Sequence, residues 1–279
     1  MSWLLEPLQY AFMVRGLMAS VMVGILCSVM GTYVVLRGMA FLGDAMAHAI
    51  LPGIAIAYLL HGNLLVGAMV AAVVVAISIG VFSKGGAIKE DTAIGILFAA
   101  ALALGVALIS SIQTYAVDLS HILFGNVLGV SINDLVLTGV IGLFILAAVA
   151  INYKQFMVIS FDPILAATQR LPAEFLRNLM LVLLALTVVV SLQTVGVGLA
   201  AAMLITPAAT AYLLTRRLWP MMLVSAAIGA ISSIVGLYLS YYLNIVSGSA
   251  IVLSATVMFL LVFLFRSHRT KGIVAKIGG

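Results

Sequence analysis

Residues 64–82, LLVGAMVAAVVVAISIGVF, indicate the fold class of this chain, because the whole run carries no charged side chain. A helix rises 1.5 Å per residue, so about 20 apolar residues cross the hydrocarbon core of a bilayer. Similar runs recur along the 279 residues, which are 65% hydrophobic and 8% charged. The sequence therefore predicts an all-α polytopic membrane protein, a single domain over residues 1–279 with no separate water-soluble part.

Apolar runs and the turn signals between them predict nine spans. The weakest separation is between the sixth and seventh, where Gly196 and Gly198 provide the only break. Eight spans with one broken helix therefore remain an alternative. The nine runs cover about residues 13–36, 43–60, 64–82, 92–112, 135–151, 177–195, 198–214, 221–242 and 249–265.

Lys and Arg residues occupy alternate connections between these spans. They occur near 37, at 84–89, at 154–177, at 216–217 and in the tail 266–279, whereas 61–63, 113–134, 196 and 243–248 contain none. By the positive-inside rule, the C-terminus is expected in the cytoplasm and the N-terminus outside. The net charge of +5 comes from these loops, so it does not indicate a nucleic-acid partner.

Two ionisable residues, Asp44 and His48, lie within the second span, in the run RGMAFLGDAMAHAILPG at residues 37–53. Their spacing of four places them on one helix face. A carboxylate and an imidazole suit a divalent first-row metal such as Mn, Fe or Zn. We expect Pro52-Gly53 to break the helix one turn later. Small residues are expected to leave the ligand face open to a pore: Gly43, Ala45, Ala47 and Ala49.

The alternative for this pair is structural. Asp44 would cap the N-terminus of the second span, and His48 would be a core histidine bonded to it. Burial of ionisable groups in so apolar a chain favours the functional interpretation, because such groups are costly in a membrane.

Two further polar segments stand out. Asp118 and His121, spaced i, i+3 in the external connection, predict an entrance for the ion or a contact with a delivery partner, with a solvated, Asp-capped loop helix as the alternative. In the cytoplasmic loop 152–176, Asp162 and Pro163 predict a helix start, and the helix would end about two turns later at Leu171-Pro172. So short a helix suggests docking to another protein, with an interfacial helix as the alternative.

Other residues are interpreted as packing features. Several glycines are expected to permit close helix contacts, and Pro207 is expected to kink the seventh span. The chain has no GxxxxGK[ST] motif, so ATP hydrolysis by that route is not expected in it.

Four runs carry a resemblance to a known family over about residues 10–265. They are RGMAFLGDAMAHAILPG (37–53), DLSHILFGNVLGVS (118–131), SFDPILAATQRLP (160–172) and SLQTVGVGLAAAMLITPAATAYLL (191–214). The chain resembles the membrane permeases of bacterial ABC importers for manganese, zinc and iron, the ABC-3 family.

The resemblance implies a type II importer-like permease in the bacterial plasma or inner membrane. It implies a homodimer bound to two cytoplasmic ATP-binding subunits and supplied by an external metal-binding protein. Asp44 and His48 would lie on the metal pathway, and no cofactor would be permanently bound. His121 is more similar to manganese members than to zinc ones.

The family's coupling helix corresponds to the segment containing Asp162, Pro163, Ala166, Ala167 and Arg170. Family members usually carry an acidic residue after the proline and a glycine before the later hydrophobic-Pro pair. This chain has Ile164 and Arg170 at those positions, so the detailed contacts with the ATP-binding subunit would differ.

The function expected from these observations is the permease subunit of an ATP-driven importer of a divalent transition metal, with manganese preferred and zinc or iron as alternatives. Such a subunit is not an enzyme, because ATP is hydrolysed on a partner chain. A secondary transporter driven by an ion gradient is the rival class. An intramembrane enzyme would need a nucleophile at matching depth, for which Ser28 and Ser191 are weak candidates.

Overall fold

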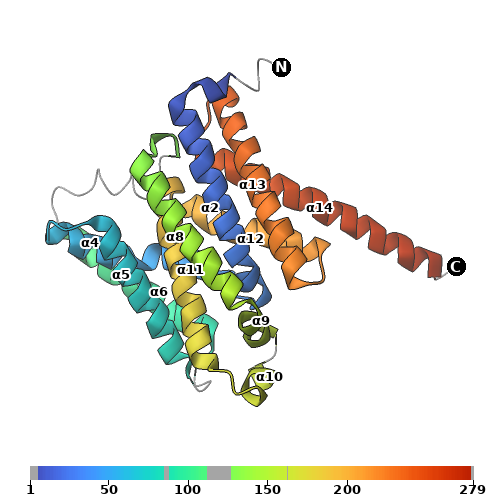
Figure 1. Cartoon of the computed structure of the whole chain (residues 1–279), viewed down its shortest axis with the longest axis horizontal. Coiled ribbons are helices and arrows are strands. Elements are labelled where there is room, and N and C mark those ends of the chain that lie inside the picture. The colour runs from blue at the N-terminus through green and yellow to red at the C-terminus, as the bar shows by residue number, and fades with distance from the viewer. Residues whose placement is uncertain (1–5, 85–87, 112–126, 162, 278–279) are drawn as a thin grey trace.

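The computed structural model describes residues 6–84, 88–111, 127–161 and 163–277, and all regular elements in these ranges are helices. Figure 1 shows them packed as one bundle, from which the C-terminal part of α14 projects. Short elements are η1 (Pro7–Gln9), η3 (Val127–Gly129), α9 (Tyr153–Phe161) and α10 (Pro163–Thr168). The bundle itself is made of α2 (Ala11–Leu36), α3 (Leu42–Ala49), α4 (Leu51–Leu59), α5 (Leu64–Phe82), α6 (Glu90–Ser110), α8 (Ile132–Ile151), α11 (Ala173–Val195), α12 (Val197–Leu214), α13 (Leu218–Leu243) and α14 (Ser247–Ile277).

Eight helical segments in the described part of the chain are long and apolar enough to cross a membrane, with α3 and α4 together forming one of them. The prediction of an all-α polytopic membrane protein is confirmed. A shorter apolar stretch, Leu199–Leu214, lies in α12. It corresponds to the predicted seventh span.

The contacts of α12 decide whether it is a separate crossing. Gly196 separates it from α11 with φ 85°, a backbone region that glycine adopts readily. A Cβ built on Gly248, at the start of α14, would lie 3.9 Å from Leu199. At the other end, Arg266 of α14 donates to the carbonyl of Leu213. Since α12 runs beside α14 from Leu199 to Leu213, these contacts favour α12 as a ninth crossing of the described part of the chain over eight crossings with one broken helix.

Helix α2 lies at the centre of the bundle and packs closely on α13. A Cβ on Gly24 would come within 2.8 Å of the Gly229 carbonyl oxygen, so the two backbones touch at this point. The hydroxyl of Ser225 donates to the Ser28 carbonyl at 2.9 Å. Small residues drive such contacts in membranes, where apolar burial gives little advantage.

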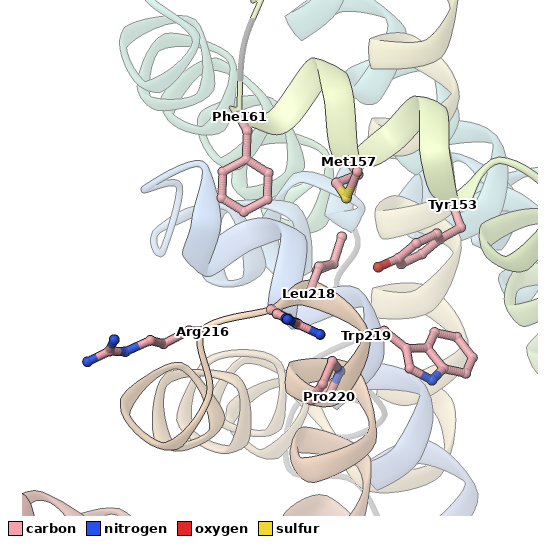
Figure 2. A pocket seen from close by; sticks show the side chains of 8 residues that line it. Tyr153, Met157, Phe161, Arg216, Leu218, Trp219 and Pro220 are labelled. Atoms are coloured by element: carbon pink, nitrogen blue, oxygen red, sulfur yellow. The ribbon is translucent and has the colours of Figure 1, made fainter.

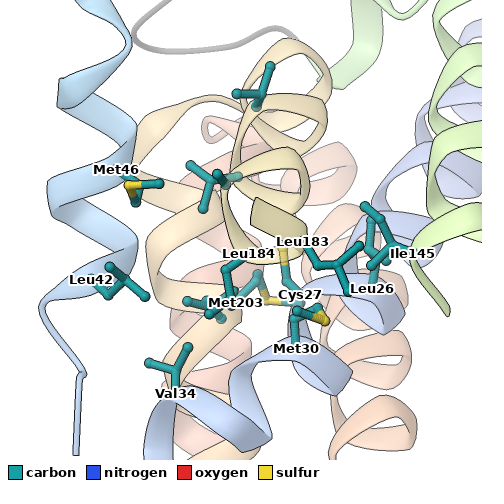
Figure 3. Packing of buried hydrophobic residues seen from close by; sticks show 14 of the residues in the cluster. Leu26, Cys27, Met30, Val34, Leu42, Met46, Ile145, Leu183, Leu184 and Met203 are labelled. Carbon is teal, nitrogen blue, oxygen red and sulfur yellow. The ribbon is translucent and has the colours of Figure 1, made fainter. Parts of the chain in front are cut away.

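Helix α2 also packs on α11 and α12. Figure 3 shows Cys27 and Met30 of α2 beside Leu183 and Leu184 of α11 and Met203 of α12. All five side chains are almost fully buried. This apolar core fixes the elements that carry the polar residues described below.

The break in the second span comes earlier than predicted. Helix α3 ends at Ala49 and α4 begins at Leu51, so the break falls at Ile50, with Pro52 in the first turn of α4. Proline has no N–H to donate to the carbonyl of His48, four residues earlier, and its ring clashes with that carbonyl. Gly53 then packs directly on the Gly67 backbone of α5. Pro207 lies inside α12, which is helical on both sides of it.

One arginine departs from the alternation of charge. Arg15 lies near the start of α2, whereas Arg37 follows its other end. The Nε atom of Arg15 donates to the Ala11 carbonyl at 3.3 Å. Figure 1 places the N-terminal end of α2 and the helices α9 and α10 at opposite ends of the bundle.

Candidate functional site

Asp44 and His48 lie on one face of α3, as their spacing predicts. The His48 Nε2 atom is 3.8 Å from Asp44 Oδ1, and the side chains are 30% and 47% exposed, respectively. Phe41 occupies the N-cap position, and no side chain caps this helix end. Asp44 therefore does not cap the span. His48 is not a core histidine either, because it is partly exposed and too far from Asp44 for a hydrogen bond.

The small residues of α3 do not line the open face, and that prediction is wrong. Gly43 and the three alanines are buried. A Cβ on Gly43 would lie 3.0 Å from the Leu204 side chain of α12. These residues do not share the face of Asp44 and His48. Their small side chains let α3 approach α12 closely. Asp44 and His48 are accessible because their side chains share the one face of α3 that does not pack on the core.

Aromatic residues border the pair. The Phe98 ring of α6 is 5.9 Å from the His48 ring and 5.5 Å from the Phe41 ring. Phe41 is three residues before Asp44 and seven before His48, so helical spacing could have placed it on this face. Phe98 is far away in the sequence, and no local pattern predicts its position. These rings restrict the approach to the two ligand atoms from the side of α6.

The pair offers two ligand atoms, fewer than a resident metal needs. Structural zinc takes four ligands, and harder divalent ions take six or more. In the described ranges, no group of three or more His, Cys, Asp or Glu side chains could hold a metal ion. Asp44 and His48 therefore do not form a closed metal site by themselves in the described part of one chain.

The predicted coupling segment contains a short helix. Helix α10 begins at Pro163 and ends at Thr168, so it is shorter than expected. Ala166 is buried, and the Leu171 N–H donates to its carbonyl at 3.1 Å. Arg170 has φ 54°, a conformation that favours glycine. The departure from the family pattern at Arg170 thus coincides with an unfavourable backbone conformation.

Three predicted site residues lie outside the described residues. They are Asp118 and His121 in the external connection and Asp162 before α10. The side chains of Pro163, Ile164 and Ala167 are likewise outside the description.

A pocket of about 490 Å³ lies between α9 and the start of α13, which no sequence pattern indicated. Figure 2 shows Met157 and Tyr153 of α9 facing Leu218 and Trp219, while the Arg216 side chain extends away from them. The Tyr153 and Trp219 rings meet edge to face at 5.8 Å. Because α9 leads to α10, this contact with α13 lies next to the predicted coupling segment along the chain.

Several helices able to cross a membrane, with a half-exposed Asp–His pair within one of them, are typical of a transport permease. Residues 9–266 match the ABC 3 transport family, and the chain belongs to that family.

Several relatives are similar over nearly their whole length. The chain is 47% identical to the manganese transport system membrane protein MntC of Halalkalibacterium halodurans over 93% of this chain and 89% of that protein. It is 48% identical to the protein of the same name from Listeria monocytogenes, over 92% of each chain. A probable iron transport system membrane protein of Haemophilus influenzae is 39% identical, over 96% of this chain and 99% of its own length.

Two solved structures share the fold. PsaBC from Streptococcus pneumoniae in complex with Fab superposes with a TM-score of 0.82 and 41% identity, over 94% of this chain and 95% of that chain. A metal-chelate type ABC transporter in an inward-facing conformation gives a TM-score of 0.71 at 15% identity, over 90% and 85% of the two chains. The second likeness concerns the fold alone.

Proposed function

We propose that this chain is the permease subunit of an ATP-driven importer of a divalent transition metal, and that manganese is the ion carried. The Asp44–His48 pair is the observation that carries the proposal. It supplies one oxygen and one nitrogen ligand on a partly exposed helix face, a set that first-row divalent metals accept. Relatives at 47–48% identity are named as manganese transport proteins.

Iron is the second candidate ion. Relatives named for iron transport are 38–39% identical to this chain. The ligand types do not separate manganese from iron or zinc, because all three accept carboxylate and imidazole. The higher identity to manganese proteins is the reason for preferring manganese.

Incomplete coordination suits transport better than a closed cage. An ion held by four or more protein ligands would dissociate slowly, whereas two ligands and water allow it to leave. We propose that two copies of the chain form a homodimer and that the second copy contributes its own Asp44 and His48 across the pathway. Each ligand acts in its metal-binding form, a carboxylate and a neutral imidazole.

The proposed coupling segment is α10 with its flanking residues. Asp162, Pro163, Ala166, Ala167 and Arg170 would contact a cytoplasmic ATP-binding subunit, of which the dimer binds two copies. The short α10 helix has few contacts with α11, so a partner surface would stabilise it. ATP-driven closure of the two subunits would then move α10 relative to the bundle.

The proposed orientation follows from the placement of charge. The N-terminus would be outside a bacterial plasma or inner membrane, and the C-terminus would be in the cytoplasm. An external metal-binding protein would deliver the ion near Asp118 and His121. Lipid would cover the many exposed apolar side chains of the outer helices.

Uptake of radioactive manganese into vesicles holding the complete transporter tests this proposal. Asp44→Asn and His48→Asn should each lower uptake by about tenfold or more, because metal sites respond on that scale to loss of a ligating or orienting group. Asp91→Asn and His61→Asn are matched controls at exposed positions and should transport normally. Normal uptake in both site variants would refute the pathway assignment, and uptake without ATP-binding subunits would favour a secondary transporter.

A further inference from the structure

A partly buried carboxylate, Glu90, lies between two arginines. Its Oε2 atom is 2.7 Å from Arg37 Nη2, and its Oε1 atom is 3.6 Å from Arg177 Nε. The three side chains are only 13–19% exposed. So enclosed a group of charges is costly to desolvate, and a role beyond stability is therefore worth testing.

The three residues join helices that are distant in the sequence. Arg37 is the C-cap residue of α2, Glu90 begins α6, and Arg177 lies near the start of α11. Arg177 also reaches α5, since its Nη2 donates to the Gly80 carbonyl at 2.8 Å. One guanidinium thus connects the end of α5, the start of α11 and the carboxylate on α6.

The two arginines are held unequally. Arg37 makes a short, charge-assisted hydrogen bond to Glu90, whereas 3.6 Å is too long for one at Arg177. The Glu90 Oε1 and Arg177 Nε atoms are buried and have no hydrogen-bond partner among the described residues. A small movement of α11 would complete that bond. Burial lowers the pKa of the Arg37 guanidinium, and the neighbouring carboxylate opposes this shift.

The cluster lies on the chain path between the coupling segment and the metal pair. Arg177 is in the first turns of α11, which follows α10 after a short connection. On the other side, Arg37 is followed by a tight corner, in which Gly38 has φ 69° and the Met39 N–H donates to the Val34 carbonyl at 3.0 Å. Helix α3, with Asp44 and His48, begins directly after this corner.

We propose that Glu90 is a positioning residue that transmits movement of α11 through Arg177 and Arg37 to α3, and so couples ATP-driven motion of α10 to the Asp44–His48 pair. The inference rests on the proposed function and deepens it. In this arrangement Glu90 accepts a hydrogen bond from Arg37 but none from Arg177. Displacement of α11 brings Arg177 within hydrogen-bond distance of Glu90. Glu90 is then shared between the two arginines, and this change in its contact with Arg37 alters the direction of the start of α3.

The rival is a static cluster that only holds the helices together. The two ideas differ in the amount of metal moved for each ATP hydrolysed, because a static cluster affects assembly but not this ratio. The experiment uses the permease with its ATP-binding subunit and metal-binding protein in proteoliposomes, and measures manganese uptake and ATP hydrolysis in the same vesicles. Glu90→Gln keeps the shape and removes the charge. Arg177→Lys keeps the charge but removes the planar fork that reaches Glu90 and α5 together.

A second ion pair provides a matched control. Lys84 Nζ lies 3.0 Å from Glu174 Oε2 and also ties the end of α5 to the start of α11, but its side chains are 64% and 57% exposed. Lys84→Gln and Glu174→Gln remove charge from the same two elements without touching Glu90.

In Glu90→Gln and Arg177→Lys, we expect uptake per ATP to fall by about tenfold, within the usual range of coupling between sites, while ATP hydrolysis and assembly stay near wild type. The controls should keep the wild-type ratio. An unchanged ratio in Arg177→Lys, an equal loss in the controls, or failure of both cluster variants to assemble would each overturn the proposal. If the wild-type vesicles take up no manganese, or Asp44→Asn has no effect, the proposed function itself is wrong.

Discussion

The imidazole of His48 and the carboxylate of Asp44 share one face of α3 with 3.8 Å between Nε2 and Oδ1. This distance permits electrostatic attraction but is too long for a hydrogen bond. Both groups keep part of their surface exposed, while the residues between and beside them are buried. An ion can therefore approach the pair without displacing the core packing of α3.

Changing the softness of one ligand should change which metal competes best. A thiolate binds zinc in preference to manganese, so His48→Cys should make zinc an inhibitor of manganese uptake that is about tenfold stronger than in the wild type. The measurement is manganese uptake against increasing zinc. His61→Cys, in the turn between α4 and α5, is the control and should leave the inhibition curve unchanged. Identical curves for His48→Cys and the wild type would remove His48 from the pathway.

Replacing Arg170 with glycine should stabilise the folded protein. Its φ of 54° costs a non-glycine residue about 1 kcal/mol, and the side chain is exposed. Arg170→Gly should therefore raise the stability of the purified permease by about 1 kcal/mol, or Tm by about 2 °C. Thermal unfolding in detergent measures this change.

The neighbouring position provides the control. Gln169 is also exposed but is not among the described residues with positive φ. Gln169→Gly should lower stability by about 0.5–1 kcal/mol, because glycine loses more backbone freedom on folding. A decrease in Tm for Arg170→Gly as large as that for Gln169→Gly would contradict the backbone argument.

The sequence predicted those features that depend on local spacing or on composition. The i, i+4 register of Asp44 and His48 is a property of any helix, and the long uncharged runs set the span positions. The break near Gly196 was also predictable, because Gly196 and Gly198 lie between two apolar runs. That α12 is a separate crossing required its contacts with α14.

Contacts between distant residues could not be predicted in the same way. Nothing near Glu90 in the sequence indicates that Arg37 and Arg177 lie beside it. Phe98 reaches His48 through the packing of α6 on α3. The burial of the small residues of α3 could not be predicted, because spacing shows which residues share a face but not which face meets the core.

The contact of α2 with α13 should tolerate no added methyl group. A Cβ on Gly24 would lie 2.8 Å from the Gly229 carbonyl oxygen, so Gly24→Ala must separate two backbones. We expect a loss of about 1–3 kcal/mol, the usual cost of overpacking. Gly95→Ala on α6 has no atom within 4 Å of the new Cβ and should gain up to about 1 kcal/mol from helix propensity. Equal Tm values for the two variants would mean that α2 and α13 are not in close contact.

Cysteine labelling can test the orientation, because the natural chain has a single cysteine, Cys27, which is fully buried. Val246, in the connection between α13 and α14, is 67% exposed, and Lys154 on α9 is exposed at the other end of the bundle. In intact cells, a membrane-impermeant maleimide should label Val246→Cys and not Lys154→Cys, whereas after permeabilisation both should react. The unmodified chain should stay unlabelled in both conditions. Labelling of Lys154→Cys alone in intact cells would show that the orientation is the opposite of the one proposed. Helix α10 would then lie outside the cell, where it could not contact a cytoplasmic ATP-binding subunit.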